Sequence, residues 1–356
     1  MQGLIFNLQM NNYFRIKFWI AATILSLLRV VMVFAIVMHP GGEPDLAVWT
    51  DRPDANVVGR WGSNASFVVI APNWIATTRH QGGSPSSVII NGISYNCQSK
   101  NEWTGGPAQT PPGIADIRLL RLTKTDGNDA NLTHYARPYE YEDEPGSDVV
   151  IGGYGVGRGD PNTVFYHGKE YIVGYDWASS SNTTRRWCQN IVDSTDTGTL
   201  SGYTSELIKA DFDGLGDDNY RPYEGIIALY DSGGGWFIYD SGEWKIAGLS
   251  RGITAVDPYT STFRNRTNPN VPQPDGMDAV RISAYAQWIK QIIQPADLME
   301  DEWVDFADFA LFADQWQRTD CNSANNWCDG ADFIPHNGAV DWNDLVIFAD
   351  RWLTSW

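Results

Sequence analysis

Short apolar or alternating runs recur along the middle of the chain, separated by turns rich in Gly, Pro, Asn and Asp. Runs of this kind are typical of β-strands. We expect strands over residues 66–71, 87–90, 117–122, 149–151, 225–229, 235–239 and 244–249. Strands do not alternate with long helical segments, so the pattern favours a β-barrel or sandwich over a doubly wound sheet.

One stretch near the end of this region has a helical period instead. Between residues 279 and 293, apolar residues recur at helical spacing from Ile282 to Ile293, which predicts a helix with one face packed on the β domain. Pro295 would end this helix, and the chain becomes strongly acidic after it. We therefore expect a domain boundary near Gln294.

The C-terminal segment contains an internal repeat. Residues 296–316 resemble residues 331–352, and each copy reads as a loop followed by a helix. Two such copies predict a pair of helices that bury a shared apolar face. We assign residues 295–356 to this small α-helical domain.

The N-terminus has the pattern of an export signal. Arg15 and Lys17 precede a long apolar run, which Arg29 interrupts. A charge at the centre of a membrane span is costly, so residues 1–35 fit a cleaved signal peptide, with a retained signal anchor as the alternative. We expect a secreted or extracellular protein, or one that is membrane-anchored and faces outside, with a main domain over residues 36–294.

Composition and charge narrow the range of partners. The 34 glycines and 18 prolines, with 19% charged residues, fit a turn-rich β protein. The formal net charge is −18, and most of it lies after residue 296, where thirteen acidic residues face only Arg318 and Arg351. Phosphate binding requires a basic patch, so nucleic acid is excluded as a partner. An acidic segment fits a solvated surface or a cation site.

The four cysteines are too few for a disulfide-based scaffold, and no CxxC pair indicates zinc. In an exported protein Cys321 and Cys328 could close a short loop. The sequence does not decide whether Cys97 and Cys188 form a pair.

Three separate segments carry the residue types of acyl-transfer chemistry. A strand and a small-residue turn end at His80, Asp116 begins an alternating strand, and Ser232 precedes three glycines. A serine hydroxyl needs a base to remove its proton, and an imidazole base needs a carboxylate to hold it. Each segment alone also has a structural interpretation, as an exposed histidine, a strand-start aspartate or a hairpin turn.

Together these segments resemble the trypsin/chymotrypsin family of serine peptidases. The matching residues are Thr77-Thr-Arg-His80, Asp116-Ile-Arg-Leu-Leu120, Tyr230-Asp-Ser-Gly-Gly234 and Ala247-Gly-Leu-Ser-Arg-Gly252. The resemblance implies a mainly β fold of two antiparallel β-barrels, and a secreted serine endopeptidase that hydrolyses peptide bonds through an acyl-enzyme. It implies that His80 is the general base, Asp116 orients it and Ser232 is the nucleophile, with no cofactor for catalysis.

The same resemblance assigns further roles. The N–H groups of Tyr230 and Ser232 would form the oxyanion hole, and Ser250 and Gly252 would bind the backbone of a protein or peptide substrate as an added strand. Ile226 would floor the pocket for the P1 side chain, which predicts an apolar or small residue there. The family has glycine where this chain has Tyr230, and this departure motivates the alternative of a catalytically impaired protease-fold binding protein.

The resemblance also implies a way of switching the enzyme on. In the family, a freshly cut N-terminal Ile-Val inserts into the domain, and its ammonium pairs with the aspartate before the nucleophile, here Asp231. Val33-Phe-Ala35 meets the preference of a signal peptidase, and cleavage after Ala35 would expose Ile36-Val37. Export would then perform the activating cut, unless an internal arginine pairs with Asp231 instead.

The repeats of the C-terminal domain resemble dockerin modules, whose calcium loops are similar to those of EF-hands. The resemblance implies calcium ligands at Asp297, Asp301, Asp305 and Asp308 in the first loop and at Asp332, Asn337, Asp341 and Asp344 in the second. It also implies a cohesin-like or cell-surface partner for this domain. The alternative is a packed pair of acidic helices that binds no ion.

Overall fold

The computed structural model describes most of the chain after the predicted export segment. The described residues are 36–39, 48–83, 85–105, 113–178, 184–255, 257, 259–263 and 274–354. The predicted export segment, residues 1–35, lies outside them. Among the described residues, no helix is both long and apolar enough to cross a membrane.

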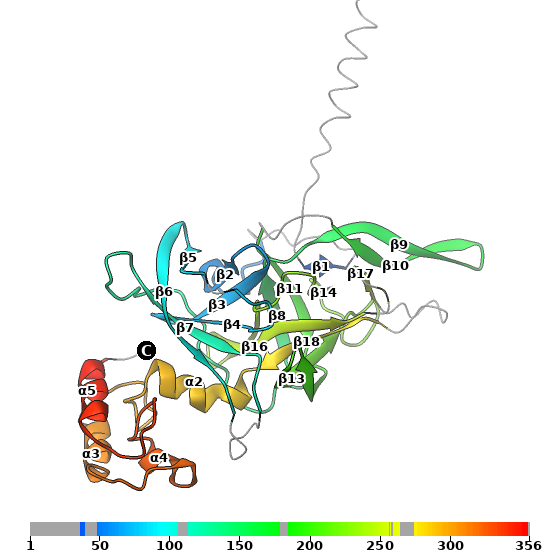
Figure 1. Ribbon diagram of the computed structural model, residues 1–356. Coiled ribbons are helices and arrows are strands. Elements are labelled where there is room, and N and C mark those ends of the chain that lie inside the picture. The colour runs from blue at the N-terminus through cyan, green and yellow to red at the C-terminus, as the bar shows by residue number, and fades with distance from the viewer. Residues whose placement is uncertain are drawn as a thin grey trace, which may run out of the picture. The chain divides into compact units, whose positions relative to one another are not determined.

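The protein is mainly β, with two large antiparallel sheets and few helices (Figure 1). The first sheet has the strand order β2-β3-β4-β7-β6-β5, and its edge strands β2 and β5 approach each other, so it is nearly closed and barrel-like. Its strands are β2 (Val58–Trp61), β3 (Ala65–Ala71), β4 (Trp74–Thr77), β5 (Ser87–Ile90), β6 (Ile93–Glu102) and β7 (Arg118–Thr123). All residues of β3 and β4 are buried, which explains their continuous apolar runs.

The second sheet has the strand order β11-β8-β15-β16-β18-β13-β12. Its strands are β8 (Asp148–Gly153), β11 (Arg186–Ile191), β12 (Ser194–Leu200), β13 (Tyr203–Asp211), β15 (Gly235–Asp240), β16 (Glu243–Thr254) and β18 (Gly276–Arg281). Up to Leu249, β16 pairs with β15, whereas Ser250 to Thr254 pair with β18 alone among the described strands.

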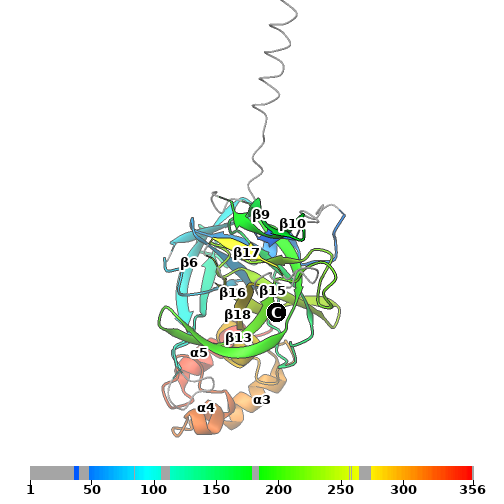
Figure 2. The same cartoon turned by 90° about the vertical axis from the view of Figure 1, so that its right-hand side faces the viewer.

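Two smaller sheets complete the β structure. A long hairpin of β9 (Arg158–Tyr166) and β10 (Lys169–Trp177) extends to the right in Figure 1 and points toward the viewer in Figure 2, and β17 (Thr260–Thr262) pairs with β10. The other pairs β1 (Val37–Met38) with β14 (Gly225–Ile226). This pairing brings the start of the described chain beside the segment that precedes Ser232.

A shared core joins the two large sheets. Val68 and Trp74 of the first sheet belong to the same buried cluster as Trp187 and Phe237 of the second. Burial of side chains this large is a major source of folding free energy. The cluster therefore holds the ends of β4, β7 and β15 in fixed relative positions.

The helix predicted over residues 279–293 is shorter than expected. Residues 279–281 belong to β18, a short 3-10 turn follows (η2, Ser283–Tyr285), and α2 covers Ala286–Ile293. Residues 279 and 280 are fully buried in ladders with both β13 and β16, so tertiary pairing overrides the helical spacing there. α2 does bury one face, as predicted.

In the described part of the C-terminal segment, the two longer helices are α3 (Phe306–Asp314) and α5 (Trp342–Arg351), and the short helices η3 (Ser323–Asn325) and α4 (Asn326–Asp329) lie between them in the sequence. Phe312 and Phe348 stack between α3 and α5, with ring centroids 5.2 Å apart. A disulfide joins Cys321 to Cys328, which confirms the short loop. The other two cysteines, Cys97 and Cys188, are free.

Candidate active site

Three loops bring His80, Asp116 and Ser232 to one place. His80 follows β4 and Asp116 precedes β7, and these two strands pair directly. Ser232 lies in the turn between β14 and β15. Ser66 of β3 ties this turn to the first sheet, because its N–H donates a hydrogen bond of 2.8 Å to the carbonyl oxygen of Ser232.

The three side chains form one hydrogen-bonded row. His80 Nδ1 lies 2.6 Å from Asp116 Oδ2, and His80 Nε2 lies 2.8 Å from Ser232 Oγ. The Asp116 side chain has no exposed surface, whereas that of His80 is 13% exposed. A base that contacts a hydroxyl on one side and a carboxylate on the other can activate the hydroxyl as a nucleophile.

Backbone amides hold the Asp116 carboxylate in place. The N–H groups of Arg79 and His80 donate to its Oδ1 at 2.7 and 2.9 Å, which leaves Oδ2 for the imidazole. The N–H of Asp116 itself donates to Ser205 Oγ at 2.9 Å. The sequence did not predict a role for Ser205, because it comes from β13 in the second sheet and no local pattern marks it.

The turn that carries Ser232 is tight and hydrogen-bonded to itself. The N–H of Gly234 donates to the carbonyl oxygen of Asp231 at 2.8 Å. Gly233 has a φ of 80°, and a Cβ there would lie 2.3 Å from the carbonyl oxygen of Ser66. Only glycine fits this position, both in conformation and in space.

Tyr230 adopts a conformation that is usual for glycine. Its φ is 76°, which costs an L-residue about 1–2 kcal/mol. Its partly buried ring packs against a core cluster, and this packing stabilises the strained residue. Within the described part of the chain, the backbone N–H groups of Tyr230 and Ser232 have no hydrogen-bond acceptor. Both are therefore available to donate to another group.

Asp231 is buried beneath this turn. Burial raises its pKa to about 7, although hydrogen bonds from the N–H groups of Ala228 and Gly155 (2.9 and 2.7 Å) and the charge of Arg186 oppose the rise. The N–H of Ile36 also donates to this carboxylate and lowers its pKa. Asp231 is thus a buried carboxyl group with several donors around it.

Ile36 and the residues after it are anchored next to Asp231. Ile36 is fully buried. Arg158 Nη1 donates to the carbonyl oxygens of Met38 and His39 at 3.3 and 3.0 Å, which holds the segment in place. The sequence suggested two possible partners for Asp231, the N-terminal segment and an internal arginine. Both lie near it: Ile36 donates a backbone hydrogen bond to it, and the charge of Arg186 acts on it.

Solved structures similar to this chain include a serine protease. It is mouse neuropsin, described as a serine protease expressed in the limbic system of the brain, with 14% identity and a TM-score of 0.42 over 68% of this chain and 97% of neuropsin. A mutant of human heparin binding protein (CAP37) has 14% identity and a TM-score of 0.41 over 68% of this chain and 93% of that protein. No protein-family model matches the chain, and no curated protein matches its sequence.

Of the three residues predicted to bind substrate, Ser250 and Gly252 lie on β16 and Ile226 lies on β14. Ser250 joins this strand to the Ser232 turn, because its N–H donates to Gly234 and its carbonyl oxygen accepts from Gly233, both at 2.8 Å. Gly252 pairs with β18. Ile226 is fully buried in the core, so its side chain does not line an open pocket in this structure.

In the C-terminal segment, the first acidic loop forms a carboxylate cluster. Carboxylate oxygens of Asp297, Asp301 and Asp308 lie within 4.8 Å of one another. Burial raises the pKa of Asp297 to about 6, and the neighbouring acidic charges add to this rise. Asp305, the fourth predicted ligand, lies outside the cluster and caps α3 by accepting a 2.7 Å bond from the N–H of Ala307.

The second acidic loop is organised by hydrogen bonds. Buried Asp332 accepts from the N–H groups of Asn337 and Gly338 at 3.1 and 3.0 Å. Asp344 and Asp341 form a capping box at the start of α5, and Asn337 Nδ2 donates to Asp341 Oδ2 at 3.2 Å. The three carboxylates of this loop do not gather as those of the first loop do, judged over the described residues.

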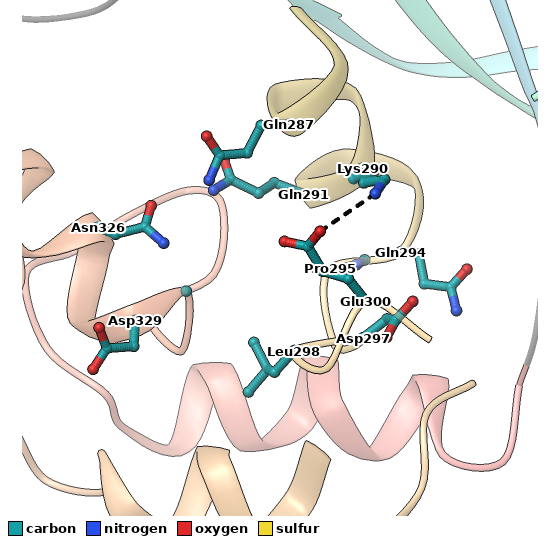
Figure 3. Close-up of a pocket in the computed structure, with 11 residues that line it drawn as sticks. Gln287, Lys290, Gln291, Gln294, Pro295, Asp297, Leu298, Glu300, Asn326 and Asp329 are labelled. Carbon is teal, nitrogen blue, oxygen red and sulfur yellow. Dashed lines mark hydrogen bonds and ion pairs between the residues drawn. The ribbon is translucent and has the colours of Figure 1, made fainter. Parts of the chain in front are cut away.

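A small polar pocket lies beside the first loop (Figure 3). Its volume is about 70 Å³, and Gln287 and Gln291 of α2 line it together with Asp297 and Asn326. The dashed line in Figure 3 marks the contact of 3.5 Å between Lys290 Nζ and Glu300. No member of the His80, Asp116 and Ser232 row lines this pocket, so it is separate from the candidate active site.

Proposed function

We propose that this chain is a secreted serine endopeptidase of the trypsin-like type with a dockerin-like C-terminal domain. The observation that carries the proposal is that His80 contacts Asp116 and Ser232 at the same time. These partners are 36 and 152 positions away from it in the sequence. Three chemically matched groups from distant segments are a specific arrangement, and they support acyl transfer to Ser232.

In the proposed reaction, Ser232 Oγ attacks the carbonyl carbon of the scissile peptide bond while His80 Nε2 takes the hydroxyl proton. The C–N bond then breaks, and His80 gives that proton to the leaving amine, so an acyl-enzyme ester remains on Ser232. Water next loses a proton to His80 and attacks the ester, and the proton returns to Ser232 as the acid product leaves. Asp116 stabilises the imidazolium that forms in each half-reaction.

The free N–H groups of Tyr230 and Ser232 support an oxyanion hole. Negative charge develops on the carbonyl oxygen when Ser232 attacks, and two preorganised donors would stabilise it. One such donor is worth roughly 10²–10³-fold in kcat in other hydrolases. Among the described strands, Gly252 to Thr254 of β16 pair only with β18, and their other edge supports binding of the substrate backbone as an added strand. The N–H and C=O groups of Ser250 already bond to Gly234 and Gly233, so this support does not extend to Ser250. For the P1 residue we propose an apolar or small side chain on the sequence resemblance alone.

The contact of Ile36 with Asp231 supports activation by cleavage after Ala35. The N–H that donates to the carboxylate would become an ammonium at the same place. We accordingly propose that residues 1–35 are removed during export and that residues 36–294 are the peptidase domain. A retained membrane anchor with the enzyme facing outside is the alternative.

For residues 295–356 we propose a dockerin-like domain with calcium in its loops. Asp297, Asp301 and Asp308 fit a hard cation, because they gather oxygen ligands where burial and like charge raise a carboxyl pKa. In the second loop the ligands would be Asp332, Asn337, Asp341 and Asp344. Calcium would neutralise the repulsion between these carboxylates. A cohesin-like or cell-surface partner is proposed from the sequence resemblance alone.

Hydrolysis of a mixed peptide pool tests the peptidase proposal. Ser232→Ala removes the nucleophile from a turn that tolerates a small residue, so we expect kcat/KM to fall by more than about 10⁴-fold with no change in thermal unfolding. His80→Ala should cause a similar loss, because the two residues act as a unit. Ser63→Ala, at an exposed turn serine, is the matched control and should keep wild-type activity.

Full turnover by Ser232→Ala would contradict the assignment of the nucleophile. A folded wild-type protein that binds peptides without cleaving them would instead favour the alternative, a protease-fold binding protein.

A further inference from the structure

β16 has an irregularity in its pairing at Arg251, just after its pairing with β15 ends at Leu249. In the ladder with β18, Ser250 pairs with Ala279 and Gly252 pairs with Asp278, so Arg251 is an extra residue in β16. A bulge of this kind bends its strand, increases the local twist and re-aims the groups that follow. The bulge therefore sets the direction in which the last residues of β16 present their N–H and C=O groups.

An ion pair connects the bulged residue to the neighbouring strand. Arg251 Nε and Nη2 donate to the two carboxylate oxygens of Asp278 at 2.7 and 2.9 Å. The two side chains are only 8% and 11% exposed. Arg251 Nη2 reaches Gly198 of β12, where an added Cβ would lie 3.1 Å away. The guanidinium thus lies beside a position of β12 that has no side chain.

Stability alone does not account for this pair. Burial costs several kcal/mol for each charge, and the attraction offsets this cost only when the remaining donors are satisfied. Arg251 Nη1 is buried with no hydrogen-bond partner among the described residues, and an unmet buried donor costs about 1–3 kcal/mol. The pair therefore contributes little net stability, but its two parallel hydrogen bonds fix the geometry of β16 against β18.

We infer that the Arg251–Asp278 pair positions the substrate-binding edge of β16 by holding the bulge at Arg251. The inference rests on the proposed peptidase function. Arg251 is a positioning residue here, because it acts through the backbone of residues 252–254 and not on the scissile bond. The pair matters for substrates that extend along β16, and not for those that occupy only the space beside Ser232.

Two substrates with the same P1 residue test whether the pair matters only for substrates that extend along β16. One is a peptide that extends four residues before the scissile bond, and the other is the ester of a single N-acetylated amino acid. Arg251→Met and Asp278→Asn each remove one charge of the pair. We expect both variants to lower kcat/KM for the peptide about tenfold, mainly through KM, as loss of one or two backbone hydrogen bonds implies. The kcat/KM for the ester and the rate of labelling by a fluorophosphonate should each change less than about twofold.

The ratio of the two kcat/KM values does not depend on the fraction of protein that is folded, so it remains informative for a destabilised variant. Arg281→Met is the matched control, because Arg281 is also a buried arginine with a carboxylate partner, Glu144, at 2.7 Å. It should keep the wild-type ratio even where it lowers stability. Arg251→Lys keeps the charge and is expected to recover part of the peptide activity.

If Arg251→Met and Asp278→Asn left the ratio of kcat/KM for the peptide to kcat/KM for the ester unchanged, the inference would be overturned while the peptidase function stayed intact. A folded wild-type protein that cleaves neither substrate and takes no label would instead contradict the proposed function itself.

Discussion

Tyr230 holds a backbone conformation that is strained for any residue with a side chain, because a φ of 76° brings Cβ close to the following carbonyl. Its ring packs against the cluster that contains Trp236 and Ile226, and this contact opposes the strain. The sequence marked Tyr230 as a departure from glycine. It could not show that the backbone N–H is nevertheless free, because that depends on φ and on contacts with distant segments.

We expect Tyr230→Gly to leave kcat within about threefold of the wild type, since the donor is already available. Tyr230→Ala is the matched control, because both variants lose the ring and only alanine keeps the strain. Urea unfolding should show the glycine variant to be more stable than the alanine variant by about 1 kcal/mol. If the glycine variant instead turned over faster by roughly two orders of magnitude, tyrosine would be misdirecting the donor.

At the scale of elements, the strands predicted from the sequence are those with continuous or alternating apolar residues. The runs over 66–71 and 87–90 agree with β3 and β5. β9 and β12 were missed because most of their residues are polar and at least partly exposed, so pairing with β10 and β13 defines them. The run over 225–229 ends early as a strand, because the N–H of Ala228 donates to Asp231 instead of to a neighbouring strand.

The first acidic loop gives a prediction about calcium. Burial and, to a lesser extent, the neighbouring acidic charges raise the pKa of Asp297, and a bound cation would offset both effects, so millimolar calcium should raise the unfolding temperature by a few degrees. Asp297→Asn should remove most of this shift. Asp320→Asn, at an exposed acid paired with Arg318, is the control and should keep it. Thermal unfolding with calcium and with a chelator measures the effect, and equal shifts in both variants would exclude the Asp297 site.

At the scale of the whole molecule, the site forms where segments from the two large sheets meet. The resemblance of the motifs, in order and approximate spacing, to the trypsin/chymotrypsin family predicted His80, Asp116 and Ser232 together, and the structure places them in hydrogen-bonding contact. The groups that hold the two buried carboxylates, such as Ser205 and Gly155, could not be predicted. They contribute single donors or acceptors from strands and turns that only folding brings near.

The contact between Ile36 and Asp231 predicts how stability depends on processing. In a chain that starts before Ile36, Asp231 has a pKa of about 7, so the folded state keeps a proton that the unfolded state loses near pH 4. Stability should therefore fall as the pH rises from about 4 to 7. A chain that starts at Ile36 has an ammonium group beside the Asp231 carboxylate, so it should lose less stability over the same pH range.

Unfolding temperatures at pH 5 and pH 8 measure this difference between chains that start at Val33 and at Ile36. Asp231→Asn in the longer chain should remove most of the pH dependence. N-terminal sequencing of the secreted, active protein should find Ile36 first. An active enzyme that begins at any other residue would refute activation by cleavage after Ala35.

The most direct test of the central claim, that Ser232 is an activated nucleophile, is to treat the chain that starts at Ile36 with a fluorophosphonate and to locate the adduct by mass spectrometry. We predict one adduct per chain, on Ser232, and a loss of labelling in His80→Ala, because the hydroxyl reacts only when the imidazole takes its proton. A folded chain that takes no label, or that carries the label on another serine, would contradict the claim.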